Sequence, residues 1–597
     1  MTVRLMNSRS NKLKVCRILP FFLSRLNLEH ERWCCRNIDP DASLDHALFR
    51  HDFSLKLLAW AIQNNANLNT VERYLKYFSQ ARIEQEFSTE LTATDGGRGF
   101  PILYFAVERN SPELVRLLCR AGAQPSQRMR PSGIPIVKLP LLAYAILSAE
   151  YRLVDTTDTV IALLAMGASP GDVPRDMWEN YLKAPTKDVP VPMDAKTGED
   201  LWCTSVLREA ICRNLNLMQR YALWKADGTE QQTKRMRQIV TALNIQPLLE
   251  TIYYIIGQRS ATQQVVQRIV DYIMYGDGEA TPLVLLFTGP SGHGKTELAR
   301  RMGELLSLKM HTVDCTEMKQ ETDMFGPKKP YDGYEQGTPL NNFLWENAGE
   351  RCVVFLDEVE KMGVEVRNAM LKLFESGMYK DRRDDKPANC SKVIWVLAAN
   401  LGCEIIQNFW VHHLKDRTEE QQRKVSFASF ERILKESIIR NLGAPFTGRL
   451  TAIVPFMPFN AGEQAVATYK FMRDLSNKAR KPIDTAAKHF PRHIFLNYND
   501  DGSIAAHIAK ANYSTETGAR TLQHAVNREI RGRLSHAFLA QEEMVKDEMN
   551  EGPWQNYEVR LVRVEKDVNE VSVELRGTRQ IQLPSQKPTE GEPAKEE

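Results

Sequence analysis

A stretch of eight residues has the composition and spacing of a loop that binds phosphate groups: Gly289, Pro290, Ser291, Gly292, His293, Gly294, Lys295 and Thr296. Its glycines let successive backbone N–H groups point at phosphate oxygens, and a helix that starts at the loop adds the positive end of its dipole. In such a loop the lysine reaches the terminal phosphates, and the hydroxyl after it ligates magnesium. The pattern therefore predicts a site for a nucleoside triphosphate, with Thr296 as a ligand of Mg²⁺.

Two carboxylates come directly after an apolar run further along the chain. Residues 352–356 have the character of a buried strand, and Asp357 and Glu358 follow them. Asp357 is expected to hold the magnesium ion through water, and Glu358 to polarise an attacking water as general base. The alternative is a strand end capped by two solvated acids, but the phosphate loop upstream favours the catalytic interpretation.

A third apolar run, Val393–Ala399, ends at Asn400. The amide of Asn400 is expected to orient the same water and to sense the terminal phosphate, although asparagine is also a common turn residue. The phosphate loop itself follows the apolar run Leu283–Phe287 and precedes a helical stretch over residues 297–306. Because ligands bind at the carboxyl ends of parallel strands, these runs predict an α/β module with a parallel sheet flanked by helices.

The first part of the chain has a different, helical pattern. Three similar blocks recur at residues 58–62, 103–107 and 142–146, and amphipathic segments at 112–118 and 160–164 follow the last two. Two of the resulting helix pairs end in Gly-Ala-x-Pro, where glycine can end a helix in a left-handed conformation. The pattern resembles the ankyrin repeat and predicts an all-α, ankyrin-like repeat domain. Its expected use is a surface for a protein partner, and a merely stabilising appendage is the alternative.

From Tyr254 to Arg576 the order of motifs resembles the second ATPase ring of the ClpB/Hsp104 disaggregases, a family of AAA+ ATPases. In addition to the phosphate loop and the strands that end in acids and asparagine, the family has four further landmarks. Four stretches of this chain resemble them: an adenine-packing segment with Ile255 and Ile256, a substrate-gripping pore loop over residues 326–337 with Tyr331, an arginine finger at Arg449, and a second nucleotide sensor at Arg520.

The resemblance implies ATP and Mg²⁺ as cofactors, with catalytic roles for Glu358, Asn400, Arg449 and Arg520. It also implies a homo-oligomeric ring, by resemblance a hexamer, in which a neighbouring copy supplies Arg449 and Tyr331 pulls unfolded or aggregated protein clients. The alternative is an ankyrin scaffold with a slow, ATP-dependent assembly switch and no threading.

Three details of the sequence depart from the family or limit its partners. Lys328-Lys329-Pro330 precedes Tyr331 where the family has small residues, and Gly448 replaces the asparagine before Arg449. No Ile-Gly-Phe or Leu-Gly-Phe tripeptide is present, so no partnership with a Clp peptidase is expected.

Composition excludes several other classes of protein. The 597 residues carry a formal net charge of only +3, and no local basic stripe accompanies it, so no nucleic-acid partner is expected. No apolar run approaches the ~18 residues of a membrane span, so no membrane association is expected. Ten cysteines without a CxxC pair fit a reducing compartment.

The motifs divide the chain into six expected parts: a basic N-terminal segment 1–43, ankyrin-like repeats 44–228, a linker helix 229–250, a large ATPase subdomain 251–460, a Clp-type small subdomain of helices and strands 461–576, and a disordered tail 577–597. The first 28 residues contain six arginines and lysines and no acid, which resembles a mitochondrial presequence. A mitochondrial location is therefore expected, with a cytoplasmic location as the alternative.

Overall fold

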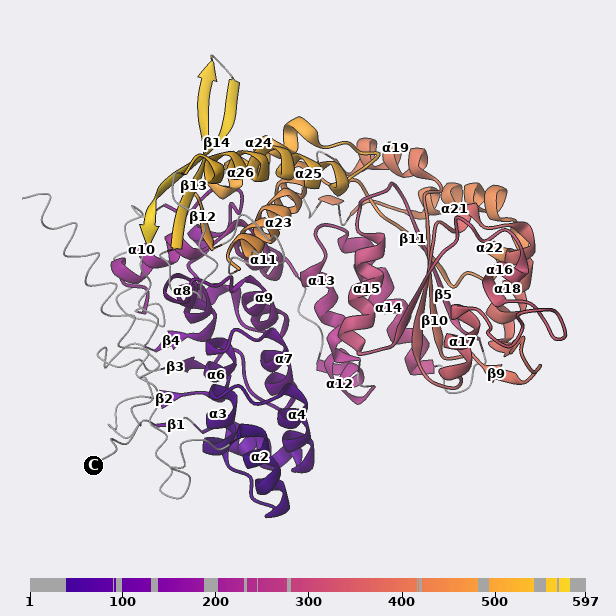
Figure 1. Ribbon diagram of the computed structural model, residues 1–597, viewed down its shortest axis with the longest axis horizontal. Coiled ribbons are helices and arrows are strands. Elements are labelled where there is room, and N and C mark those ends of the chain that lie inside the picture. Colours follow the sequence, from indigo (N-terminus) through magenta and orange to yellow (C-terminus); the bar gives the residue numbers. More distant parts are fainter. Residues whose placement is uncertain are drawn as a thin grey trace, which may run out of the picture.

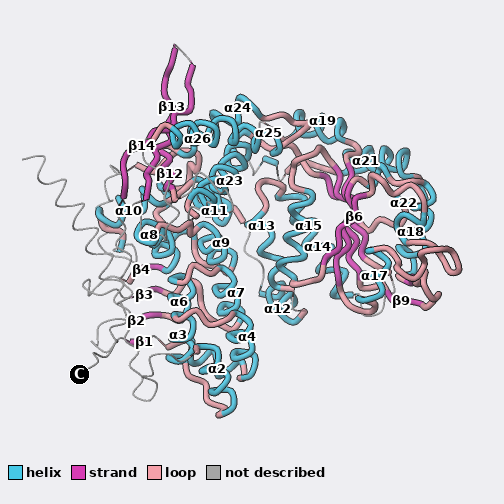
Figure 2. Tube along the Cα trace, in the orientation of Figure 1, coloured by secondary structure: helices cyan, strands magenta, loops and turns pink. Residues whose placement is uncertain are grey.

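The computed structural model describes residues 39–89, 91–92, 99–129, 138–186, 202–229, 234–243, 245–275, 281–415, 417, 421–422, 424–481, 493–541, 554–565 and 568–579. A column of helices lies beside an α/β subdomain, and a smaller subdomain of helices and strands lies across the top of both (Figures 1 and 2). Within the described ranges, no helix combines the length and apolar character needed to cross a membrane.

The α/β subdomain is built on a five-stranded parallel sheet in the order β11-β5-β10-β7-β6. Its strands are β5 (Leu283–Thr288), β6 (Met310–Asp314), β7 (Cys352–Asp357), β10 (Val393–Ala399) and β11 (Ala452–Pro455). The three apolar runs of the sequence are thus β5, β7 and β10, and β10 lies between the other two. Because all five strands are parallel, the loops after β5, β7 and β10 meet at one edge of the sheet.

Alternate side chains of the buried strands pack on opposite faces of this sheet. Leu285 and Phe287 share a core with α14 (Arg259–Tyr275) and α15 (Lys295–Leu306). Val284 and Leu286 face the other core. The helices of that face are α16 (Glu321–Phe325), α17 (Pro339–Glu346), α18 (Val364–Ser376), α19 (Cys403–His413), α21 (Ala428–Leu442) and α22 (Ala444–Thr447), and a hairpin of β8 (Met378–Lys380) and β9 (Pro387–Asn389) flanks them. The predicted fold of a parallel sheet between helices is confirmed.

The small subdomain combines helices with a three-stranded sheet in the order β12-β13-β14. Its elements are α23 (Ala461–Ala479), β12 (Ile494–Tyr498), α24 (Asp501–Asn512), α25 (Ala519–Val526), the π-helical turn η7 (Asn527–Gly532), α26 (Arg533–Leu539), β13 (Trp554–Glu565) and β14 (Val568–Arg579). The β13–β14 hairpin projects away from the body (Figure 1). Because β14 continues to Arg579, the prediction of disorder from residue 577 is wrong for 577–579, and residues 580–597 lie outside the described ranges.

The helical column consists of stacked helix pairs. Its helices are α2 (Pro40–Phe49), α3 (Leu55–Gln63), α4 (Leu68–Tyr77), α5 (Gln80–Phe87), α6 (Ile102–Glu108), α7 (Pro112–Arg120), α8 (Leu141–Arg152), α9 (Thr157–Ala165), α10 (Ser205–Asn214) and α11 (Leu217–Asp227). Each apolar block predicted as a short helix is one, in α3, α6 and α8. Gly122 and Gly167 follow α7 and α9 with φ of 109° and 105°, a region that favours glycine.

Three predicted boundaries or classes need correction. The column is not purely helical, because β1 (Leu91–Thr92) pairs with β2 (Gly99–Phe100) and β3 (Arg128–Met129) with β4 (Leu139–Pro140). Helix α2 already begins at Pro40, inside the segment assigned to a basic terminus, of which residues 1–38 lie outside the described ranges. The linker 229–250 is not one helix but α12 (Lys234–Ala242) followed by the 3-10 turn η5 (Gln246–Glu250).

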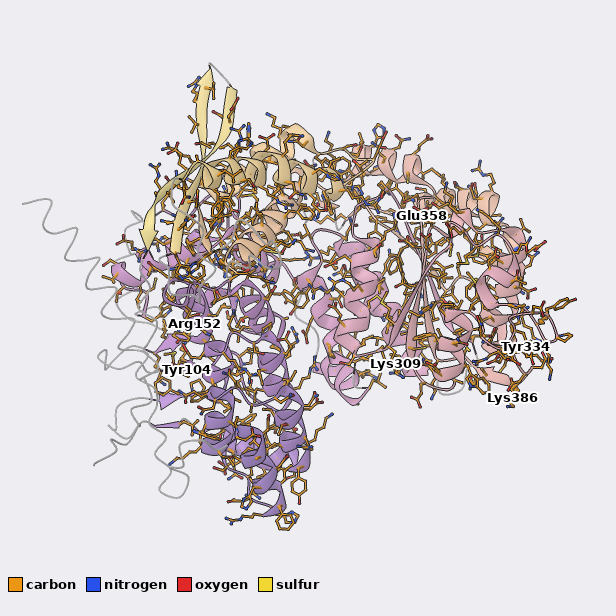
Figure 3. The ribbon with its side chains drawn as sticks, viewed as in Figure 1. Tyr104, Arg152, Lys309, Tyr334, Glu358 and Lys386 are labelled. Carbon is orange, nitrogen blue, oxygen red and sulfur yellow. The ribbon has the colours of Figure 1, made fainter. Side chains whose placement is uncertain are left out.

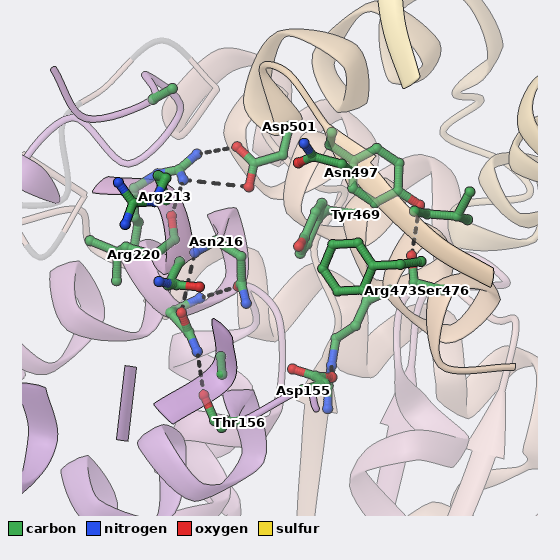
Figure 4. Close-up of a pocket in the computed structure, with 18 of the residues that line it drawn as sticks. Asp155, Thr156, Arg213, Asn216, Arg220, Tyr469, Arg473, Ser476, Asn497 and Asp501 are labelled. Atoms are coloured by element: carbon green, nitrogen blue, oxygen red, sulfur yellow. Dashed lines mark hydrogen bonds and ion pairs between the residues drawn. The ribbon is translucent and has the colours of Figure 1, made fainter. Parts of the chain in front are cut away.

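Buried ion pairs join the column to the small subdomain. Arg220 of α11 is 1% exposed and donates to Asp501 Oδ1 at 2.6 Å, while Arg473 of α23 pairs with Asp155 (Figure 4). Arg473 also pairs with Asp158, whose side chain is half exposed. Burial alone would raise the pKa of Asp155, but Arg473 and hydrogen bonds outweigh it and lower the pKa to about 2. A cavity of about 160 Å³ lies beside these pairs. Because a buried charge without its partner is strongly destabilising, these pairs hold the two units together.

Candidate nucleotide site

The phosphate loop lies between β5 and α15, as the sequence predicts. Gly289, Gly292 and Gly294 have φ of 139°, 73° and 97°, which a residue with a side chain rarely adopts. A Cβ on Gly289 would lie 2.6 Å from Phe456 O, and one on Gly292 would lie 2.2 Å from Thr517 O. The turn therefore favours glycine at all three positions, and the close approach of neighbouring backbone also requires it at Gly289 and Gly292.

Lys295 is buried at the start of α15 and already contacts a second predicted residue of the site. Its Nζ donates to Gly289 O at 2.6 Å, to Pro290 O at 3.0 Å and to Asn400 Oδ1 at 3.1 Å. Burial lowers the pKa of Lys295 to about 8. Because a phosphate oxygen is a stronger, charged acceptor than these neutral oxygens, the ammonium group fits a phosphate ligand in this place.

The two carboxylates lie at the same edge of the sheet. Asp357 ends β7 and is half-buried, and burial raises its pKa. Glu358 has φ of 53°, and its Oε2 accepts from Thr316 Oγ1 at 3.2 Å. Figure 3 shows Glu358 at the opposite end of the sheet from Lys309, which precedes β6. Thr296, the second residue of α15, is exposed and so available to a ligand.

Several residues of this edge were missed by sequence reasoning. Glu360 Oε1 accepts from the backbone N–H of Asn400 at 3.0 Å. This hydrogen bond holds Asn400, whose side chain contacts Lys295. Cys403 Sγ donates to Asn400 O at 2.9 Å. Thr316 lies just after β6, 42 positions before the glutamate that it contacts. The only available signal for Glu360 was its place two residues after Glu358, whereas nothing in the sequence pointed to Thr316.

The small subdomain closes over the phosphate loop. Ala519 N donates to Gly292 O at 3.0 Å, and a Cβ on Gly518 would lie 2.6 Å from the same oxygen. His293 is fully buried, and its Nε2 lies 2.9 Å from Tyr513 Oη at the end of α24. The phosphate loop thus contacts the segment that contains Arg520. Arg520 is exposed, and its positive charge lies close enough to Lys295 to lower the pKa of that lysine.

Replacing His293 by glutamine is expected to reduce the sensitivity of the protein's stability to acid. Burial lowers the pKa of His293 from 6.5 to about 4, so the unfolded chain takes up this proton at a higher pH than the folded chain does. The stability from neutral His293 is present above pH 6.5 and is lost as the pH falls towards 4, a change of about 3 kcal/mol. Thermal unfolding between about pH 7 and about pH 4 should show a steeper fall for wild type than for His293→Gln. The same loss of stability between these pH values in both proteins would contradict the lowered pKa of His293.

Ile255 and Ile256 lie between the two ATPase subdomains. Ile255 is 2% exposed in the core that contains β5 and α15, while the half-buried Ile256 packs against the core of the small subdomain. Gly257 follows with φ of 61°, and a Cβ there would lie 2.9 Å from the carboxylate of Glu463. This segment is therefore held tightly from two sides, next to the helix that begins at the phosphate loop.

The structure does not bring Arg449 and Tyr331 into this site. Arg449 Nη2 pairs with Glu375 Oε2 of α18 at 2.7 Å, and its Nη1 donates to Pro445 O at 2.8 Å. Tyr331 is 70% exposed in the loop between α16 and α17. Tyr334 of the same loop lies at the outer end of the α/β subdomain, away from Glu358 (Figure 3). Both predicted residues thus face surroundings outside their own chain's phosphate site.

A parallel sheet with a glycine-rich loop, a buried lysine and paired carboxylates at one edge defines a P-loop nucleotide-binding module. Residues 281–453 match the family described as AAA domain (Cdc48 subfamily), and residues 484–550 match the C-terminal, D2-small domain of ClpB protein. Residues 281–453 and 484–550 therefore carry the sequence of an AAA+ ATPase domain and of a ClpB-type small domain.

Curated proteins and solved structures also resemble the chain. The Chaperone protein ClpB of Chlamydia caviae is 28% identical over 262 residues, which are 43% of this chain and 28% of that protein. The Mitochondrial disaggregase of Homo sapiens is 26% identical over 309 residues, 48% of this chain and 41% of that one. The chain thus spans less than a third of the length of that ClpB. Among solved structures, the S. cerevisiae Hsp104-ADP complex is 20% identical with a TM-score of 0.41, covering 74% of this chain and 69% of that one.

Proposed function

We propose that the protein is an ATP-hydrolysing chaperone that unfolds or disaggregates other proteins by threading them through a ring of its own copies. The observation that carries the proposal is the contact of Lys295 Nζ with Asn400 Oδ1 at 3.1 Å, at the edge of the sheet where Asp357 and Glu358 also lie. The names of the relatives, ClpB chaperones and mitochondrial disaggregases, support the same activity.

In this proposal each residue of the site has a defined task. Lys295 binds the terminal phosphates of ATP, and Ile255 and Ile256 pack on its adenine. Glu358 takes a proton from the attacking water that Asn400 orients. Arg520 contacts the nucleotide from the small subdomain of the same chain.

The residues present fit a magnesium ion that is held mainly by the nucleotide. Thr296 and Asp357 supply oxygen ligands, as Mg²⁺ prefers. Within the described ranges no group of three or more His, Cys, Asp or Glu could hold a metal by itself, which suits an ion bound through one carboxylate and substrate phosphates. When bound, the ion would neutralise charge on the β- and γ-phosphate oxygens.

Arg449 is proposed to act on the ATP of a neighbouring copy, in a ring that we take to be a hexamer. Its partners within the chain are Glu375 and Pro445, on the side of the subdomain formed by α18 and α22, so its charge lies on a surface that an adjacent copy can meet. A partner protein on the repeat column and a mitochondrial location, as in the named mitochondrial relatives, belong to the same proposal. Nucleic acid, membranes and a Clp peptidase are not proposed as partners.

Replacing Tyr331 by alanine is expected to abolish most recovery of aggregated luciferase while ATP hydrolysis persists. Tyr331 is 70% exposed, and an aromatic ring can press on any polypeptide without reading its sequence. The matched control is Tyr275→Ala, because Tyr275 is equally exposed at 70% but lies at the end of α14. Recovery at the wild-type level by Tyr331→Ala would contradict threading and favour the slow assembly switch.

A further inference from the structure

Helix α11, the last helix of the helical column, bonds directly to the backbone of the adenine-packing segment, residues 255–257. Lys225 Nζ of α11 donates to Ile255 O at 2.6 Å, and Tyr221 Oη accepts from Gly257 N at 3.1 Å. Both side chains are buried, with 6% and 5% exposure. The ammonium of Lys225 also lies 5.6 Å from the centre of the Tyr221 ring, so the two groups form one contact.

Helix α11 is itself fixed against the small subdomain. The first backbone N–H of α11, on Leu217, donates to Asp501 Oδ2 at 2.6 Å, and Arg220 pairs with the same carboxylate. Leu217, Met218 and Tyr221 pack in one core with α23. This helix is therefore anchored at its start by α24 and along its face by α23.

The adenine-packing segment contacts both α11 and α23. Tyr221 and Lys225 of α11 bond to its backbone, and the Glu463 carboxylate of α23 lies 2.9 Å from a Cβ placed on Gly257. A shift of α11 would leave the buried Ile255 carbonyl without its charged donor, which is costly. The position of Ile255 and Ile256 thus depends on a helix that belongs to the repeat column.

We propose that Lys225 and Tyr221 are positioning residues for nucleotide binding, so that the repeat column forms part of the support of the nucleotide site. The inference rests on the proposed packing of adenine on Ile255 and Ile256. It implies that a nucleotide in the site and the placement of α11 stabilise each other, because coupling between two sites is reciprocal. A protein bound to the column would reach the ATPase through this helix.

The test is equilibrium binding of fluorescent mant-ADP to the full chain, with competition by unlabelled ADP and GDP. Lys225→Met is expected to weaken mant-ADP binding by about fivefold or more, which is typical of the coupling between two sites. It should also reduce the preference for ADP over GDP, because Ile255 and Ile256, which pack on the purine, would shift. Tyr221→Phe should act in the same direction with a smaller effect, and Lys225→Arg should restore part of the loss. The matched control is Lys76→Met, because Lys76 is an exposed lysine of α4 that pairs with nearby Glu72.

Unchanged affinity and unchanged purine preference in both Lys225→Met and Tyr221→Phe would overturn the inference. A general structural defect would lower affinity for ADP and GDP equally, which would also contradict it. Should Lys225→Met fail to fold, hydrogen exchange on the wild type decides: ADP should slow exchange of the amides of residues 217–227, and no slowing would overturn the coupling. Wild type that binds neither nucleotide would instead refute the proposed site.

Discussion

Replacing Arg449 by alanine is expected to lower ATP hydrolysis by about a thousandfold or more, because an arginine that stabilises charge on a transferring phosphoryl group contributes about 10³ to 10⁵ in rate. Binding of ATP should persist, since Arg449 bonds to Glu375 and Pro445, which lie outside the phosphate loop. The fold should persist too, because the Glu375 side of its ion pair is 65% exposed and such pairs contribute about 1 kcal/mol or less. Steady-state phosphate release measures the effect.

Mixed oligomers show whether Arg449 acts between copies. A copy with Arg449→Ala keeps Glu358, and a copy with Glu358→Gln keeps Arg449, so a boundary at which the first copy holds the nucleotide and the second supplies the arginine contains a complete site. Mixing the two inactive variants should therefore restore part of the hydrolysis. Arg440→Ala, on the exposed surface of α21, is the matched control and should hydrolyse ATP at the wild-type rate. A mixture no faster than the sum of its separate parts would count against a shared site.

Replacing Glu358 by glutamine is expected to lower hydrolysis by about 10² to 10⁴, the usual contribution of a general base. Glutamine has the same shape and can still accept from Thr316 Oγ1, but it cannot take a proton from water. ATP should remain bound, so the variant should accumulate as an ATP-bound oligomer. Single-turnover phosphate release, together with nucleotide retention on a sizing column, measures both effects.

Two further variants are compared with Glu358→Gln, one expected to lose ATP binding and one expected to behave as wild type. Lys295→Ala should lose ATP binding itself, because it removes the buried ammonium group from the phosphate loop. Glu365→Gln, an exposed acid in the first turn of α18, should behave as wild type. Phosphate release by Glu358→Gln at the wild-type rate would refute the assignment of the base.

Much of the ATPase module could be predicted from local patterns. The strands β5, β7 and β10 are continuous apolar runs, and glycine, lysine and carboxylates follow them at spacings that few other structures require. The prediction failed where local patterns carry little information. The linker contains a 3-10 turn rather than one helix, and the pairs β1–β2 and β3–β4 are strands of two residues, too short for an alternating pattern.

The contacts within the site depend on sheet order and on packing between subdomains. Asn400 lies 105 positions from Lys295, and the two touch because β10 is inserted between β5 and β7. His293 contacts Tyr513, which lies 220 positions further along the chain. Lys225 contacts Ile255, although the sequence patterns assign these two residues to different domains. No spacing rule connects such residues.

The sequence by itself determined the identity of the phosphate loop, the carboxylates and the strands that end beside them, because these depend on backbone geometry and hydrophobic periodicity over a few residues. Only the tertiary structure decided that Glu360 supports Asn400, that the small subdomain closes on Gly292, and that α11 bonds to the backbone of Ile255. The physical reason is that these contacts arise from how separate cores pack, and buried polar groups find their partners in space rather than along the chain.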